Sequence, residues 1–194
     1  MSRKITNDKH VARVVRKLYA DAQAIDWEHV TSADKTARYA HWLDDPLVGG
    51  LLGQWMSPEE ARVWIKDGPM KEYVRAIAGF GPFAQYLDEH PRGPTAMVRL
   101  ALGKEWTPVS GTEGVKPLHC DATSGSGTVR LIWGPSRDFK HLLWAALEAS
   151  DRNKKKEVKI AVFDTVAHPT SSATKAPHER FCTRCGFAVT HVRL

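Results

Sequence analysis

The sequence contains only three cysteines in 194 residues, at positions 120, 182 and 185. A small and odd number of cysteines argues against a disulfide framework and favours a reducing, intracellular compartment. No apolar run approaches the roughly 18 residues that a transmembrane helix needs, so we expect no contact with the membrane interior. The start of the chain, MSRKITNDKHVARVV, carries charges where a signal peptide has an apolar stretch, which predicts a cytoplasmic protein.

Several motifs that identify common enzyme and binding classes are also missing. The chain has no P-loop, no G-x-S-x-G nucleophile motif and no H-E-x-x-H metal motif. It has neither a complete C₂H₂ zinc-finger pattern nor an RNP signature. These absences leave P-loop nucleotide hydrolases, G-x-S-x-G hydrolases and zinc metalloproteases without support.

Positive charge is distributed unevenly along the chain. Residues 1–95 contain 13 Lys+Arg and 13 Asp+Glu, whereas residues 96–194 contain 15 and 9, so the whole net charge of +6 belongs to the second half. A basic half predicts an anionic ligand or macromolecule, such as a phosphorylated cofactor, a nucleic acid or an acidic protein surface. A solvated basic face without a partner is the alternative. The basic residues that we consider for nucleic-acid contact are the lysines at 154–156 and Arg13, Arg16 and Lys17.

The first half has the pattern of helices. Val11, Val14, Val15, Leu18 and Tyr19 recur at helical spacing. The segment SPEEARVWI combines an N-cap serine, a proline at the first helical position and a glutamate that completes a capping box. Helical patterns continue to the PRGP segment at 91–94, so we predict a helical region over residues 1–95.

The second half has mostly strand patterns. AMVRLAL, EWTPVS, VKPLHCD and TVRLIW are predicted strands, followed by a helix from Phe139, the strand EVKIAVFDT, the loop HPTSSATKAP and a final strand FAVTHVRL. Together the two halves predict an α+β fold, with a mixed sheet over residues 96–194.

From Thr128 onward, the order strand, helix, strand, short helix, strand is carried by TVRLIW, SRDFKHLLWAALEAS, EVKIAVFDT and HERFCTRCGFAVTHV. This segment resembles the C-terminal half of the Gcn5-related (GNAT) N-acetyltransferases, and most of all their small, divergent tailed-phage members, in which H-x-R-F precedes the closing turn. The resemblance implies acetyl-coenzyme A as cofactor, with its pyrophosphate at the N-terminus of the helix, where backbone N–H groups are free. It implies cofactor contacts at Ile132, Trp133, Arg137 and Lys140. It also requires the strand TVRLIW to splay from its neighbour so that the acyl group can insert.

Acetyl transfer needs a base for the acceptor amine and an acid for the leaving thiolate. His119 and Asp121 stand at the end of a predicted strand and are our candidates for the base, because an imidazole has an unperturbed pKa of about 6.5. Cys182 falls where the family has its tyrosine general acid. The alternative is that these three residues are structural.

Cys182 and Cys185 also form a C-x-x-C pair, which is one knuckle of a zinc ribbon. The second C-x-x-C knuckle of a zinc ribbon does not occur in the sequence. His178 stands four residues before Cys182, so both face the same side of a helix, and Cys120 or His119 would complete a four-ligand zinc site. The alternative is two ordinary thiols, with Phe181 and Phe187 anchoring the segment in the core.

Three functional hypotheses therefore stand. The first is a divergent acetyltransferase-like protein that binds acetyl-coenzyme A. The second is a basic, non-enzymatic module with a zinc-stabilised C-terminus that binds nucleic acid or a protein partner. The third is a phage or host-interaction protein that keeps the fold without catalysis. Most tryptophans are predicted at helical core positions, namely Trp42, Trp55, Trp64 and Trp144.

Overall fold

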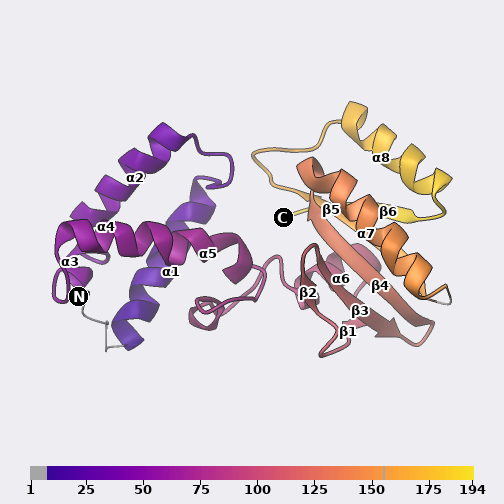
Figure 1. The fold of residues 1–194 in the computed structure, drawn as a ribbon, viewed down its shortest axis with the longest axis horizontal. Coiled ribbons are helices and arrows are strands. Elements are labelled where there is room, and N and C mark those ends of the chain that lie inside the picture. Colours follow the sequence, from indigo (N-terminus) through magenta and orange to yellow (C-terminus); the bar gives the residue numbers. More distant parts are fainter. Residues whose placement is uncertain (1–7, 155) are drawn as a thin grey trace. The chain divides into compact units, whose positions relative to one another are not determined.

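The computed structural model describes residues 8–154 and 156–194. The chain divides into two compact units, one ending at His90 and one running from Pro91 to Leu194 (Figure 1). The first unit is helical and the second contains the sheet, which confirms the predicted α+β class. Among the described residues, no helix combines the length and apolar character needed to cross a bilayer. Lys155, part of the basic run considered above, lies outside the described residues.

Within residues 8–90, five α-helices and a short 3₁₀ helix build the first unit. Their bounds are α1 Asp8–Ala24, α2 Ser32–Asp44, α3 Gly49–Leu52, α4 Pro58–Asp67, α5 Pro69–Ala76 and η1 Ala84–Tyr86. The predicted capping box begins α4, since the amide of Glu60 donates to Oγ of Ser57 at 3.3 Å and the amide of Ser57 donates to Oε2 of Glu60 at 2.9 Å. The apolar face of α1 is buried in the core of this unit, as its spacing predicts.

A tight corner joins α4 to α5 through Gly68 alone. A Cβ atom at this position would lie 2.7 Å from the carbonyl oxygen of Trp64. Backbone cannot move aside as a side chain can, so the corner requires a residue without a side chain.

The second unit contains a six-stranded mixed sheet. Its strands are β1 Thr107–Pro108, β2 Gly114–Val115, β3 Leu118–Ser124, β4 Gly127–Pro135, β5 Glu157–Asp164 and β6 Ala188–Arg193. The order is β1-β3-β4-β5-β6, with β2 paired to β3 outside this path. The β1–β3 and β3–β4 pairs are antiparallel, whereas the β4–β5 and β5–β6 pairs are parallel. The parallel crossovers run through α7 Phe139–Arg152, preceded by η2 Ser136–Asp138, and through α8 Ser172–Arg184.

The helices cover both faces of this sheet (Figure 1). On one face, α6 Pro94–Leu102 packs against a core that includes Leu131 and Trp133. On the other face, α7 and α8 pack against a core that includes Ile132 and Cys182. Alternation along β4 explains the division, because successive strand residues point to opposite faces.

Two secondary-structure predictions in the second half were wrong. AMVRLAL forms most of α6 rather than a strand, with Gly93 as N-cap and Pro94 in the first turn, and its alanines, leucines and methionine are good helix formers. The predicted loop HPTSSATKAP contains the start of α8, which begins at Ser172. Oγ of Ser171 caps this helix by accepting from the amide of Thr174 at 3.2 Å.

Two predicted core aromatics are instead exposed. The exposed fraction is 64% for Trp144 and 50% for Phe181. His178 and Cys182, one turn apart, form the buried face of α8, so Phe181 falls on the outer side of the helix. Phe187 does pack partly against the core, and Trp42 is fully buried as predicted.

Candidate functional site

A cavity of about 190 Å³ lies in the second unit between the C-terminal half of α7 and the strands β3, β4 and β5. The turn before β3 and the segment between α7 and β5 complete its wall. Five of the lining residues are apolar. The other seven are polar and predominantly cationic: Lys116, His119, Arg130, Glu148, Arg152, Asn153 and Lys156.

Strand register brings the polar residues together. In the β3–β4 pair, His119 lies opposite Ile132 and Asp121 lies opposite Arg130. These four side chains share one face of the sheet, because their neighbour Cys120 belongs to the core on the α6 side. Since α7 packs on β4 and β5, the same face of β3 is free to carry polar groups.

The carboxylate of Asp121 holds two cations at the cavity. Nε of Arg130 donates to Oδ1 of Asp121 at 2.8 Å, and Nζ of Lys156 donates to Oδ2 at 2.6 Å. The Asp121 side chain is only 8% exposed, whereas those of Arg130 and Lys156 are 29% and 27% exposed. Burial by itself raises the pKa of Asp121, but the hydrogen bonds and charges of the two cations outweigh it and lower the pKa below its usual value. Asp121 is therefore ionised at neutral pH, and one carboxylate beside two cations leaves an excess of one positive charge.

The backbone of Asp121 is fixed by the loop between β1 and β2. The amide of Asp121 donates to Oγ1 of Thr112 at 2.9 Å, and the amide of Val109 donates to the carbonyl of Asp121 at 2.8 Å. The hydroxyl of Thr112 in turn donates to the carbonyl of Val109 at 2.6 Å. These bonds hold the carboxylate, and with it both cations, in one place.

One ring nitrogen of His119 is already engaged in a hydrogen bond. Nδ1 lies 2.9 Å from the carbonyl oxygen of Pro117. A carbonyl only accepts, so in the neutral ring Nδ1 carries the proton and Nε2 carries a lone pair. Among the described residues, no hydrogen bond occupies Nε2.

The structure separates the residues that the sequence grouped as one acetyl-transfer site. His119 and Ile132 line the cavity, and Asp121 binds the lining residues Arg130 and Lys156. Asp121 is a poor base, because its pKa is lowered by two cations. Trp133 does not contact this region, since it is fully buried on the α6 face, where Nε1 donates to the carbonyl of Arg92 at 3.0 Å.

The predicted pyrophosphate contacts Arg137 and Lys140 are exposed at the N-terminal end of α7, away from the cavity at its C-terminal half. Beside them, β4 pairs with β5 from Val129, opposite Glu157, to Pro135, opposite Phe163. Pro135 is the last residue of β4, so the pairing continues to the end of the strand. The strands do not splay as acyl-coenzyme A insertion requires.

Cys182 is fully buried in the α7–α8 core, which does not support its predicted role as a general acid. Burial, and next the charge of Cys185, raises the pKa of this thiol to about 11. The thiol therefore stays protonated and out of reach of a substrate.

The predicted zinc ligands do not converge. Cys182 and Cys120 are buried on opposite faces of the sheet, and Cys185 is exposed. Nδ1 of His178 lies 3.2 Å from Nε2 of His191 instead of facing a thiol. Within residues 8–154 and 156–194, none of the four belongs to a cluster of three or more potential metal ligands. The described residues therefore give the zinc prediction no support.

Sequence patterns did not assign Arg130 to any site, and they predicted Lys156 only as a nucleic-acid contact. Arg130 interrupts the apolar strand TVRLIW, and a charged residue within a buried strand indicates a partner of opposite charge. Lys156 is the last of three consecutive lysines, and such a run also suits a helix C-terminus, so the pattern did not distinguish Lys156 from its neighbours.

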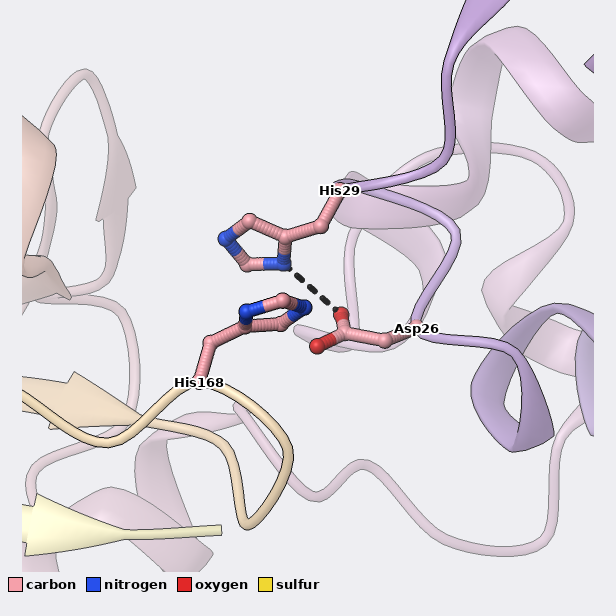
Figure 2. Close-up of side chains that lie close together, drawn as sticks. All are labelled: Asp26, His29 and His168. Carbon is pink, nitrogen blue, oxygen red and sulfur yellow. Dashed lines mark ion pairs between the residues drawn. The ribbon is translucent and has the colours of Figure 1, made fainter.

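The first unit contains a different acid–histidine pair. Nδ1 of His29 lies 3.1 Å from Oδ1 of Asp26 (Figure 2), and the amide of His29 donates to the carbonyl of Asp26 at 2.9 Å. Asp26 has a φ of 50° in the turn after α1, a conformation that aspartate tolerates better than most residues. His168, which the figure also draws, belongs to the second unit, on the loop between β5 and α8.

Comparison of the chain with protein-family models, with curated proteins and with solved structures finds no match in any of the three. The geometry of the cavity therefore carries the functional argument.

Proposed function

We propose that the second unit binds a small organic anion, with a carboxylate or phosphate group, in the cavity beneath the C-terminal half of α7. The observation that carries this proposal is the pair of cations, Arg130 and Lys156, fixed on the one carboxylate of Asp121. One carboxylate neutralises one of the two charges. The remaining positive charge faces a partly enclosed space, where Coulomb attraction is several times stronger than in water.

The rim of the cavity adds to this charge. Lys116 and Arg152 line it together with Arg130 and Lys156, against the carboxylates of Glu148 and Asp121. Four cations and two carboxylates leave a net charge of two positive. Arg152 is only loosely held by Glu148, since Nη2 lies 3.4 Å from Oε2.

Arg130 keeps hydrogen-bond donors for a ligand. Its Nε atom binds Asp121, and within the described part of the chain its two Nη groups donate to no other residue. A guanidinium presents a planar fork of donors that matches a carboxylate or phosphate. A ligand can therefore bind Arg130 while Asp121 stays in place.

The rest of the lining limits the size and character of the ligand. Ile132, Ala145, Ala149 and Val158 supply apolar surface for a short carbon skeleton. A volume of about 190 Å³ lies below the range of about 300–1,000 Å³ typical of drug-sized ligands. These features favour a small metabolite over a nucleic-acid chain.

Acetyl-coenzyme A transfer, which the resemblance from Thr128 onward suggests, is supported less well. Its predicted contacts Arg137 and Lys140 lie at the other end of α7, and β4 and β5 stay paired where the acyl group would insert.

Thermal unfolding with added ligands tests the proposal. A ligand that binds only the native state raises the melting temperature. At constant ionic strength, we expect ethyl phosphate or propanoate to stabilise the wild type and Lys154→Gln equally, and to stabilise Lys156→Gln much less. Lys154 is the matched control, because it is an exposed lysine outside the cavity lining.

Equal stabilisation of Lys156→Gln and wild type would contradict the proposal, provided that circular dichroism shows both to be folded. Without any response to the small anions, stabilisation by acetyl-coenzyme A would favour the acetyltransferase-like hypothesis. Stabilisation by an oligonucleotide would favour the nucleic-acid-binding hypothesis.

A further inference from the structure

We infer that the ligand of this cavity is a hydroxylated anion, whose hydroxyl donates a hydrogen bond to Nε2 of His119 while its anionic group binds Arg130 and Lys156. The inference rests on the proposed function and adds a second point of recognition. It selects hydroxycarboxylates and hydroxyalkyl phosphates over the same anions without a hydroxyl.

The tautomer of His119 determines what it recognises. Because Nδ1 donates to the carbonyl of Pro117 at 2.9 Å, Nε2 of the neutral ring accepts. An accepting nitrogen in a cavity wall binds a ligand that donates, such as a hydroxyl. A second anionic group, which only accepts, gains nothing from it.

The imidazole of His119 packs directly against Gly114. A Cβ atom at Gly114 would lie 2.6 Å from Nε2 of His119, closer than van der Waals contact permits. Any side chain at this position would therefore displace the imidazole. The β2–β3 pairing, in which Gly114 lies opposite His119, keeps glycine in this place.

Strand geometry sets the distance between the two recognition points. Arg130 lies opposite Asp121, two residues along β3 from His119, so His119 and Arg130 are diagonal neighbours on one face of the sheet, about 7–8 Å apart. A hydrogen bond at each end and a spacer of two or three carbons cover this distance. The apolar residues Ile132 and Val158 lie in the same wall, where they contact such a spacer.

The positive charge of the cavity favours a hydroxyl over an ammonium group as the hydrogen-bond donor of the ligand. The cavity has four cations against two carboxylates, so a positively charged ligand group is repelled. A neutral hydroxyl donates to Nε2 without this cost.

Isothermal titration calorimetry on the full chain tests the inference with two matched ligand pairs: 2-hydroxyethyl phosphate against ethyl phosphate, and 3-hydroxypropanoate against propanoate. Comparison of the two pairs also shows whether the site prefers a phosphate or a carboxylate group. In the wild type we expect the hydroxylated member of the bound pair to bind about three- to tenfold more tightly, the gain from one hydrogen bond.

In His119→Phe this affinity ratio should fall to one, because the ring shape is kept and the acceptor is lost. His141→Phe is the matched control and should keep the wild-type ratio, since His141 is exposed on α7 outside the cavity. Gly114→Ala, which displaces the imidazole from its place, should reduce the ratio as well and serves as a second variant if His119→Phe does not fold.

Two results would overturn the inference and leave anion binding intact: a ratio of one in the wild type, or an unchanged ratio in both His119→Phe and Gly114→Ala. Lys156→Gln should weaken both members of a pair by the same factor, which reports on the anion site separately. Binding of none of the four ligands would contradict the proposed function itself, and the inference with it.

Discussion

Nδ1 of His178 lies 3.2 Å from Nε2 of His191, and this contact joins α8 to β6. The two rings are nearly parallel, with centroids 5.5 Å apart, and a face of His178 stacks on Phe139 of α7 at 3.9 Å between centroids. A hydrogen bond between two imidazoles needs one proton between the facing nitrogens, so the contact exists only while at least one ring is neutral.

Acid should therefore weaken the second unit. Burial, and next the charge of His191, lowers the pKa of His178, whereas burial and Lys175 lower that of His191. The nearby carboxylates Glu179 and Asp164 act in the opposite direction without reversing the shift. The unfolded chain binds these protons more readily, so stability is complete above the unfolded pKa of about 6.5 and is lost as the pH falls below it.

Urea unfolding of the wild type and of His178→Phe, measured between pH 7.5 and pH 5.5, checks this prediction. The free energy of unfolding should fall with pH in the wild type and fall less steeply in the variant, which keeps the stacking on Phe139. Equal slopes in the two proteins would contradict a role for the pair.

Asp121→Asn should destabilise the second unit. The substitution leaves Arg130 and Lys156 close together without their shared counter-charge. Breaking a buried ion pair costs about 3–5 kcal/mol, and we expect about 1–3 kcal/mol here because both cations are partly exposed. Chemical denaturation measures the loss. Glu148→Gln, which removes an exposed carboxylate of the same cavity, is the control and should change stability by less than about 1 kcal/mol.

Gly68→Ala should destabilise the first unit by about 1–3 kcal/mol, because the added methyl group meets the carbonyl oxygen of Trp64 at 2.7 Å. Gly50→Ala is the matched control. A Cβ atom there meets Pro46 at an ordinary 3.8 Å, so this variant should be neutral or slightly more stable. Denaturant titration of both variants provides the comparison, and a similar loss in the two would show that the α4–α5 corner can relax.

The three thiols should differ in reactivity. Cys185 is exposed, whereas burial raises the pKa of Cys182 to about 11 and that of Cys120 to about 12. Because the thiolate is the reactive form, a disulfide reagent at pH 8 should modify one thiol quickly in the native protein and all three in urea. Cys185→Ser should abolish the fast reaction. A strong zinc chelator should change neither this count nor the melting temperature, and a loss of stability on chelation would restore the zinc hypothesis.

Sequence patterns predicted the local structure well where periodicity and capping agree. The apolar face of α1 and the Ser57–Glu60 capping box both appear as predicted. The prediction of a strand at 96–102 was wrong, because a short apolar segment suits either structure. Pro94 at the helix start and the packing of Met97 against the sheet favour the helix.

The sequence by itself determined the α+β class, the helical first half and the basic second half, because these depend on composition and on spacings of a few residues. Only the tertiary structure decided the cavity. Asp121 and Lys156 are 35 residues apart, and their contact exists because β3 and the start of β5 lie on either side of β4. The same strand pairing places Cys120 and Cys182 on opposite faces of the sheet, since alternation and register, not distance along the chain, decide which side chains meet.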